Sequence, residues 1–183
     1  TIEYNGTNQS ITVLNSSQSY GHLIMSGSGI KTLDGNITIV GNWTRNTGPT
    51  FNSNDKSVTF TGATKSVIIA PNLSFRDTTG SFGGETFSYL YINKTNTTDS
   101  VLFQSNIAIT KQIGFVKGRI NLGDSNVLIA SNKYRTADVD IVTTPANVNL
   151  SYSGAGRFII QRYVPSSTRT WRLLTVPIRS GSG

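Results

Sequence analysis

The chain has 183 residues, no cysteine, 16 lysines and arginines against nine aspartates and glutamates, and a formal net charge of +7. A chain of this length buries roughly 70% of its unfolded surface, which suffices for one hydrophobic core. The lack of cysteine excludes disulfides, thiolate catalysis and metal sites built from cysteine. No apolar run approaches the roughly 20 residues of a membrane-spanning helix, so we predict no membrane span.

Short apolar runs alternate with turn-forming pairs almost from one end of the chain to the other. In chain order the runs are 2–4, 11–14, 23–25, 37–40, 58–60, 67–69, 90–92, 101–103, 107–109, 113–116, 120–122 and 127–129. Pairs such as Asn5-Gly6, Asp34-Gly35 and Gly123-Asp124 lie between them and favour tight turns. The composition is also poor in strong helix formers. This pattern predicts an all-β fold.

The chain also resembles itself. The opening "TIEYNGTNQSI" matches "SVTFTGATKSV" about 56 positions later, and "YGHLIM" and "NITI" match "FSYLYI" and "NIAI". We predict two repeat units, 1–56 and 57–152, the second with an insertion at 71–84, followed by a capping and linking segment at 153–183. Such repeats are typical of the coils of a β-solenoid, similar to a parallel β-helix, here closed by a C-terminal β-hairpin-like cap. A β-sandwich is the alternative.

Alternation along the strands separates a buried set of side chains from an outward set. We expect one continuous core formed by Ile2, Tyr4, Leu23, Ile37, Ile39, Val58, Phe60, Leu90, Ile92, Ile107 and Ile109. Trp43 and Trp171 stand in apolar surroundings that favour core packing. Tyr89 and Tyr91 fall on the other side of the alternation, and they are the candidates for the aligned aromatics of a sugar-binding face.

Residues for catalysis or metal binding are scarce. The only histidine, His22, lies in the strand-like "YGHLIM", where we expect an exposed residue, and the acidic residues are scattered among turns. We therefore predict no enzyme, no catalytic residue and no cofactor. Asp138 and Asp140 share one side of a strand and are a weak candidate for calcium ligands, although a solvated pair fits them better.

Residues 156–179 contain five arginines and no acidic residue. Two apolar runs surround a turn at Pro165-Ser166-Ser167, which favours two core strands over a nucleic-acid surface with exposed aromatics. We predict no nucleic-acid partner. Instead we predict a structural cap whose arginines bond backbone carbonyls and pair with acids such as Asp138 and Asp140 or with those of the next module. The cap residues are Arg157, Arg162, Tyr163, Trp171 and Arg172.

Four motifs follow one another near the N-terminus. They are Tyr-Asn-Gly-x-x-Gln at 4–9, Tyr-x-x-Leu at 20–23, Ser-Gly-x-Lys-x-Leu at 28–33 and Asn-Ile-x-Ile-x-Gly at 36–41. With the C-terminal Trp-Arg-Leu-Leu stretch, they resemble repeat segments of large Bacteroidota surface proteins, gliding-type adhesins included, that are exported by the type IX secretion system. The second copy is looser and lacks the Ser-Gly-x-Lys step.

The resemblance implies a non-catalytic structural or adhesive repeat region of a secreted or cell-surface protein, located outside the cell. Its implied partners are an extracellular surface or polysaccharide, neighbouring modules of the same longer chain, and the secretion machinery during export. A carbohydrate-binding appendage of a larger secreted enzyme is the alternative function.

The resemblance also implies a modification. Bacteroidota O-glycosylation favours Asp-Ser/Thr followed by an aliphatic residue or Thr, and Asp99-Ser100-Val101 and Asp77-Thr78-Thr79 match this pattern. We expect both motifs in loops and predict O-linked sugars on Ser100 and Thr78.

Overall fold

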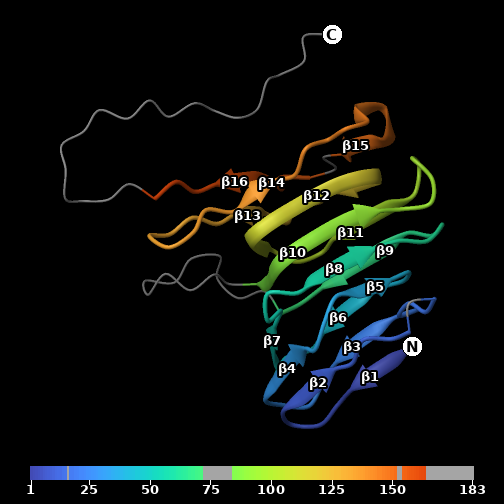
Figure 1. Ribbon diagram of the computed structural model, residues 1–183, viewed down its shortest axis with the longest axis vertical. Coiled ribbons are helices and arrows are strands. Elements are labelled where there is room, and N and C mark those ends of the chain that lie inside the picture. Colours follow the sequence, from blue (N-terminus) through green and yellow to red (C-terminus); the bar gives the residue numbers. More distant parts are fainter. Residues whose placement is uncertain (16, 72–83, 152–153, 164–183) are drawn as a thin grey trace.

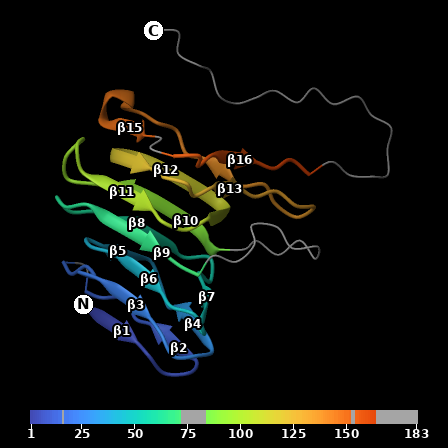
Figure 2. The same cartoon turned by 180° about the vertical axis from the view of Figure 1, so that it is seen from behind.

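A computed structural model describes residues 1–15, 17–71, 84–151 and 154–163. The chain winds into a β-solenoid of about six coils, and the strands of each coil pair in parallel with those of the next. The coils stack along the long axis, from β1 and β2 at one end to β15 and β16 at the other (Figure 1). The view from behind shows the same order along the stack (Figure 2). The predicted all-β solenoid is confirmed.

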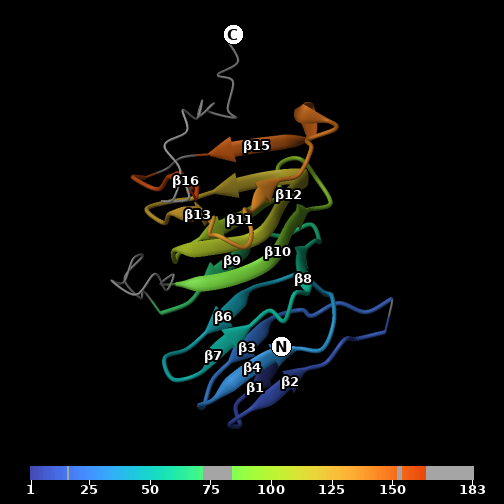
Figure 3. The ribbon, with the colours of Figure 1, turned by 60° about the vertical axis from the view of Figure 1, so that its left-hand side comes forward.

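One face of the solenoid is a ladder of parallel strands that runs the length of the stack. In order along the stack it consists of β1 (Ile2–Tyr4), β3 (Leu23–Met25), β6 (Trp43–Arg45), β9 (Ser66–Ile69), β11 (Ser100–Phe103), the end of β12 (Ile107–Asn121) and β15 (Val148–Ser151). This ladder gives the molecule one continuous flat side, whose strands stack above one another in Figure 3.

The remaining strands form the other sides of the coils. A short sheet contains β2 (Gln9–Ile11), β4 (Ile30–Leu33) and β7 (Thr50–Asn52). A longer ladder contains β5 (Ile37–Ile39), β8 (Ser57–Phe60), β10 (Glu85–Asn93), β12, β13 (Val127–Ile129), β14 (Asp138–Val139) and β16 (Phe158–Ile160). Near the end of the stack a 3₁₀ turn, Pro145–Asn147, precedes β15.

The coil is much shorter than the unit that the sequence repeat predicts. Ile2 pairs with Leu23, and Leu23 pairs with Trp43, so an uninterrupted coil takes about 20 residues. Ile2 and Val58, which the repeat aligned, lie on different sides of the solenoid, in β1 and β8. The repeat of about 56 residues therefore spans roughly three coils and relates strands of different sides.

Strand pairing continues across the predicted boundary between the two repeat units. Strand β8 pairs with β5 and with β10, so hydrogen-bonded sheet runs across the boundary expected between residues 56 and 57. Most of the predicted insertion, residues 72–83, lies outside the described residues. It falls within a longer interval, since Val58 pairs with Leu90.

The expected core is largely confirmed. Nine of its predicted members are buried in one hydrophobic cluster: Leu23, Ile37, Ile39, Val58, Phe60, Leu90, Ile92, Ile107 and Ile109. Trp43 is also fully buried, with its ring edge-on to those of Phe51 and Phe87. Ile2 is 39% exposed, contrary to expectation, because β1 is the first strand of its ladder and has a partner on one side only.

Of the predicted cap, 153–183, the structure describes residues 154–163. Strand β16 pairs in parallel with β13 and so extends the coil stack. Arg157, Arg162 and Tyr163 are exposed, and a guanidinium nitrogen of Arg162 donates to the carbonyl of Gln161. Ion pairs in the described ranges join Arg45 to Glu85 and both Lys111 and Arg135 to Asp55, so the expected pairing of Arg157 or Arg162 with Asp138 and Asp140 is not seen there. Trp171, Arg172 and the second arm of the hairpin lie outside the described residues.

Candidate functional site

Tyrosines and polar side chains lie next to one another on the outward side of β8, β10, β12 and the segment of β14. Tyr89 lies between Ser57 and Gln112 of the adjacent coils, and Tyr91 lies between Thr59 and Gly114. The inward neighbours, such as Leu90 and Ile92, belong to the core. We call this surface the tyrosine face and define it by Thr59, Tyr89, Tyr91, Gln112, Gly114, Asp138 and Asp140.

Tyr91 lies beside Gly114 of the next coil. A Cβ atom placed on Gly114 would lie only 2.3 Å from Cδ1 of Tyr91 and 2.7 Å from Cε1, so one edge of the ring occupies the space that a side chain at this glycine would need. Its hydroxyl donates to Oε1 of Gln112 at 2.7 Å. The edge contact at Gly114 and the hydrogen bond at the tip together hold the ring in place.

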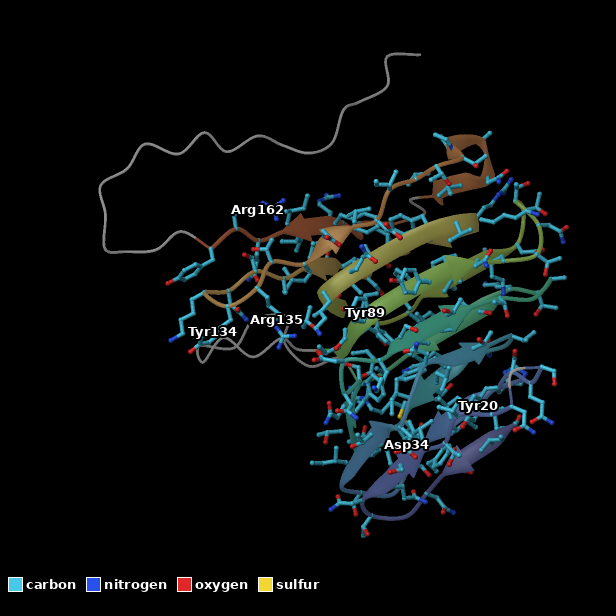
Figure 4. All side chains as sticks on the ribbon, viewed as in Figure 1. Tyr20, Asp34, Tyr89, Tyr134, Arg135 and Arg162 are labelled. Atoms are coloured by element: carbon cyan, nitrogen blue, oxygen red, sulfur yellow. The ribbon has the colours of Figure 1, made fainter. Side chains whose placement is uncertain are left out.

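Tyr89 is held in a different way. The ammonium of Lys111 lies 5.4 Å from the centre of its ring, within the range of a cation–π contact. Lys111 also bonds a carboxylate oxygen of Asp55 at 2.9 Å, and Arg135 reaches the other carboxylate oxygen at 3.7 Å. Figure 4 labels Tyr89 and Arg135 on the same side of the stack, with Tyr134 farther out.

A polar hollow of about 370 Å³ adjoins the tyrosine face. It is lined by Asn52, Ser53, Asn54, Asp55, Thr86, Ser88, Thr110 and Arg135. The hydroxyls of Ser53 and Ser88 share a hydrogen bond of 2.7 Å, which ties β10 to the turn before β8. In that turn Asn54 and Asp55 have φ angles of 47° and 57°, a left-handed conformation that short polar side chains tolerate.

The charges around the face follow from this geometry. Burial raises the pKa of the Tyr91 phenol, and the nearby charges of Asp140, Tyr89 and Asp138 raise it further. The hydrogen bond from Lys111 lowers the pKa of the Asp55 carboxyl, and Arg135 adds to this effect while burial opposes it. At neutral pH the Tyr91 phenol is therefore uncharged and Asp55 is ionised.

Asp138 and Asp140 lie beside this face, as their shared side of a strand predicts. Asp138 pairs in register with Gln112, and the backbone N–H of Asp140 bonds the carbonyl of Ile113. Nowhere in the described ranges do three or more His, Cys, Asp or Glu side chains cluster as a metal site would require. The two carboxylates are thus placed beside the tyrosines, and calcium binding by them has no support from a third acidic ligand in that part of the chain.

The other residues that the sequence singled out lie elsewhere. His22 is exposed, as expected, and its Nδ1 accepts a hydrogen bond from the backbone of Asn42. Ser100 is half-buried and begins β11, so the expectation of a loop at this position is wrong, although Asp99 before it lies in a turn. Thr78 lies outside the described residues.

Buried charges are what sequence reasoning missed. Lys31 is fully buried, and its ammonium donates to the carbonyls of Gly6, Thr7 and Ser28 at 2.5, 2.7 and 3.1 Å and to Oε1 of Gln9 at 3.0 Å. The lysine of one N-terminal motif is thereby bonded to the glycine and glutamine of another. The signal was present, because Lys31 has the same parity in β4 as the buried Leu33.

Three further charged residues, Arg45, Glu85 and Lys94, are also buried. Arg45 and Glu85 form an ion pair of 2.9 Å with both side chains almost fully buried. The same carboxylate oxygen of Glu85 accepts from the indole of Trp43, and Arg45 also donates to the carbonyls of Pro49 and Gly84. Lys94, equally buried, donates to the carbonyl of Thr61 and to the hydroxyl of Ser66. The hydrogen bonds of these buried groups connect neighbouring coils, so we assign the groups a structural role.

Comparison with protein-family models, with curated proteins and with solved structures finds no match. No helix in the described part of the chain is long and apolar enough to cross a membrane. The function is therefore argued from the tyrosine face and from the fold that carries it.

Proposed function

We propose that this chain is a non-catalytic, adhesive repeat region of a secreted or cell-surface protein exported by the type IX secretion system. It acts as a stiff spacer and, through the tyrosine face, as a contact surface for an extracellular surface or polysaccharide. The observation that carries the proposal is the tyrosine face itself, in which two outward aromatic rings stand beside amide, hydroxyl and carboxylate groups on an unbroken ladder of strands.

The buried charges support the non-catalytic part of the proposal. Arg45, Glu85, Lys31 and Lys94 are buried at contacts between coils, and each bonds backbone or side-chain groups of neighbouring coils. The exposed charges at the hollow, on Asp55, Lys111 and Arg135, are paired with one another. Groups engaged in this way stabilise the stack.

The shape of the stack supports a spacer role. Parallel coils that contact only their neighbours can be extended in one direction without altering the core. Strand β1 pairs on one side only and leaves Ile2 partly exposed, and a neighbouring module of the same longer chain would cover that edge. The alternative, a carbohydrate-binding appendage of a larger secreted enzyme, uses the same face and is favoured by the same tyrosines.

The proposal is tested on intact cells that make the protein. Antibodies against the 183-residue chain should label these cells, and protease added outside should remove the label. A strain without a working type IX system should keep the protein inside. The purified chain, incubated with neutral and acidic polysaccharides, should release no reducing ends.

Two results would contradict this function. Protection of the chain from external protease on intact cells would place it inside. Release of sugar products from any polysaccharide by the purified chain would make it an enzyme.

A further inference from the structure

We propose that the tyrosine face binds a neutral polysaccharide, with one sugar ring stacked on Tyr91 and the next on Tyr89. This inference rests on the contact role proposed above and names both the ligand class and the residues. The two tyrosines are two positions apart on β10, so their Cα atoms are separated by roughly 7 Å along the strand. Successive rings of an extended sugar chain can cover both.

Tyr91 provides the stacking platform. Sugar rings carry a patch of C–H groups that packs on the face of an aromatic ring, and a tyrosine supplies that face with little loss of side-chain entropy. Here the edge of the ring lies against Gly114 and its hydroxyl bonds Gln112, so the ring is held in one orientation before a ligand binds. A preorganised ring loses less freedom on binding than a mobile one.

Polar side chains lie on both sides of Tyr91 along the stack and can form hydrogen bonds with a bound sugar. The carboxylates of Asp138 and Asp140 lie on the far side of Gln112 and Gly114 from Tyr91, in the next coil. Carboxylates accept hydrogen bonds from sugar hydroxyls, and Thr59 on the opposite side can donate or accept. A few such groups around an apolar platform determine the orientation of a bound ligand.

The charges favour a neutral ligand over an acidic one. Asp138 and Asp140 bring negative charge next to Tyr91, strongly enough to contribute to its raised pKa. Lys111, whose ammonium lies 5.4 Å from the centre of the Tyr89 ring, and Arg135 are both paired with Asp55. An anionic sugar on Tyr91 would therefore be repelled by two carboxylates, whereas hydroxyl groups would be bonded by them.

The test is co-sedimentation of the 183-residue chain with insoluble cellulose, chitin, curdlan and mannan as neutral polymers and with calcium alginate beads as an acidic polymer. The bound fraction is measured over a range of protein concentrations at neutral pH and physiological salt. We expect at least one neutral polymer to bind the chain. Tyr91→Ala and Tyr89→Ala should each weaken that binding at least about tenfold, as expected for central aromatic contacts.

Matched variants separate stacking from folding. Gly114→Ala keeps Tyr91 but places a Cβ against the edge of its ring, so the ring must shift and binding should weaken to a similar extent. Tyr91→Phe keeps the ring but loses the bond to Gln112, so it should weaken binding less than Tyr91→Ala does. Tyr134→Ala removes a tyrosine that is 81% exposed and lies off the face, and should change nothing. Circular dichroism and urea titration check that each variant folds. If Tyr91→Ala unfolds, Tyr89→Ala alone tests the contribution of stacking, because Tyr89 packs against no glycine in the described part of the chain.

The inference is overturned if none of the four neutral polymers binds, if the chain binds alginate alone, or if binding survives both Tyr89→Ala and Gly114→Ala in folded protein. Those results would leave the surface location and the lack of turnover intact. Conversely, protein found inside the cell would remove the proposed function even if a neutral polymer binds.

Discussion

Lys31 shows how a single residue can hold two coils together. A buried ammonium without partners would cost several kcal/mol, but this one is surrounded by three carbonyls and an amide oxygen. Gly6, Thr7 and Gln9 belong to the first coil, whereas Ser28 belongs to the second. Burial lowers the pKa of Lys31, whereas hydrogen bonds to the four acceptors favour its protonated form.

Replacing this ammonium should therefore cost stability. In Lys31→Met the methionine fills similar volume but donates no hydrogen bond to the carbonyls of Gly6, Thr7 and Ser28. We expect the free energy of unfolding to fall by about 3 kcal/mol, measured by urea denaturation. Lys65→Met, at an exposed turn position, is the control and should change it by less than about 0.5 kcal/mol. Equal midpoints for both variants would show that the Lys31 bonds contribute nothing.

At the scale of the element, β12 is the strand on which most of the molecule depends. It spans Ile107–Asn121 and pairs in succession with β13, β14 and β15 of the next coil. On the preceding side it pairs with β10 and β11. One continuous strand thus turns two corners of the coil, and a shift at either end would displace every later coil.

A pair of substitutions on β12 tests its inward and outward faces. Ile107→Asp would bury a carboxylate among apolar neighbours, and we expect a loss of about 4 kcal/mol or failure to fold. Val116→Asp, on the same strand but 51% exposed, should be nearly neutral. Thermal melting followed by circular dichroism measures both. If Ile107→Asp melts with the parent, the face assignment of β12 is wrong.

At the scale of the whole molecule, stability is distributed along a stack. Each coil contacts mainly the coils on either side, so a central coil has two neighbours and a terminal coil has one. The open edge at β1, with Ile2 partly exposed, is the visible consequence in this chain.

Hydrogen exchange should therefore follow position in the stack. In the 183-residue chain, amides of β6, β8 and β10 should be the most protected, and those of β1 and β2 should exchange faster by at least about tenfold, because local opening at an end breaks fewer contacts. Mass spectrometry of peptides from exchanged protein measures this. Equal protection of β1 and β8 would indicate that the stack opens only as a whole.

Side-chain parity was the part of this fold that the sequence determined by itself. Alternation correctly assigned Leu90 and Ile92 to the core and Tyr89 and Tyr91 to the outside, and the apolar surroundings of Trp43 correctly assigned it to the interior. It works because parity along a strand is a local property of the extended backbone. The same parity marks Lys31 beside Leu33, so the buried lysine could also have been found.

Which strands lie next to one another was decided by the tertiary structure alone. Short strands of similar composition align about equally well with strands of any side, so the repeat matched Ile2 to Val58 although Ile2 pairs with Leu23. The true spacing depends on where each coil turns its corners and on how many residues a corner holds, which backbone hydrogen bonds between coils settle. For the same reason Asp55 meets Lys111 and Arg135, and the tyrosines meet Asp138 and Asp140, only once the coils are stacked.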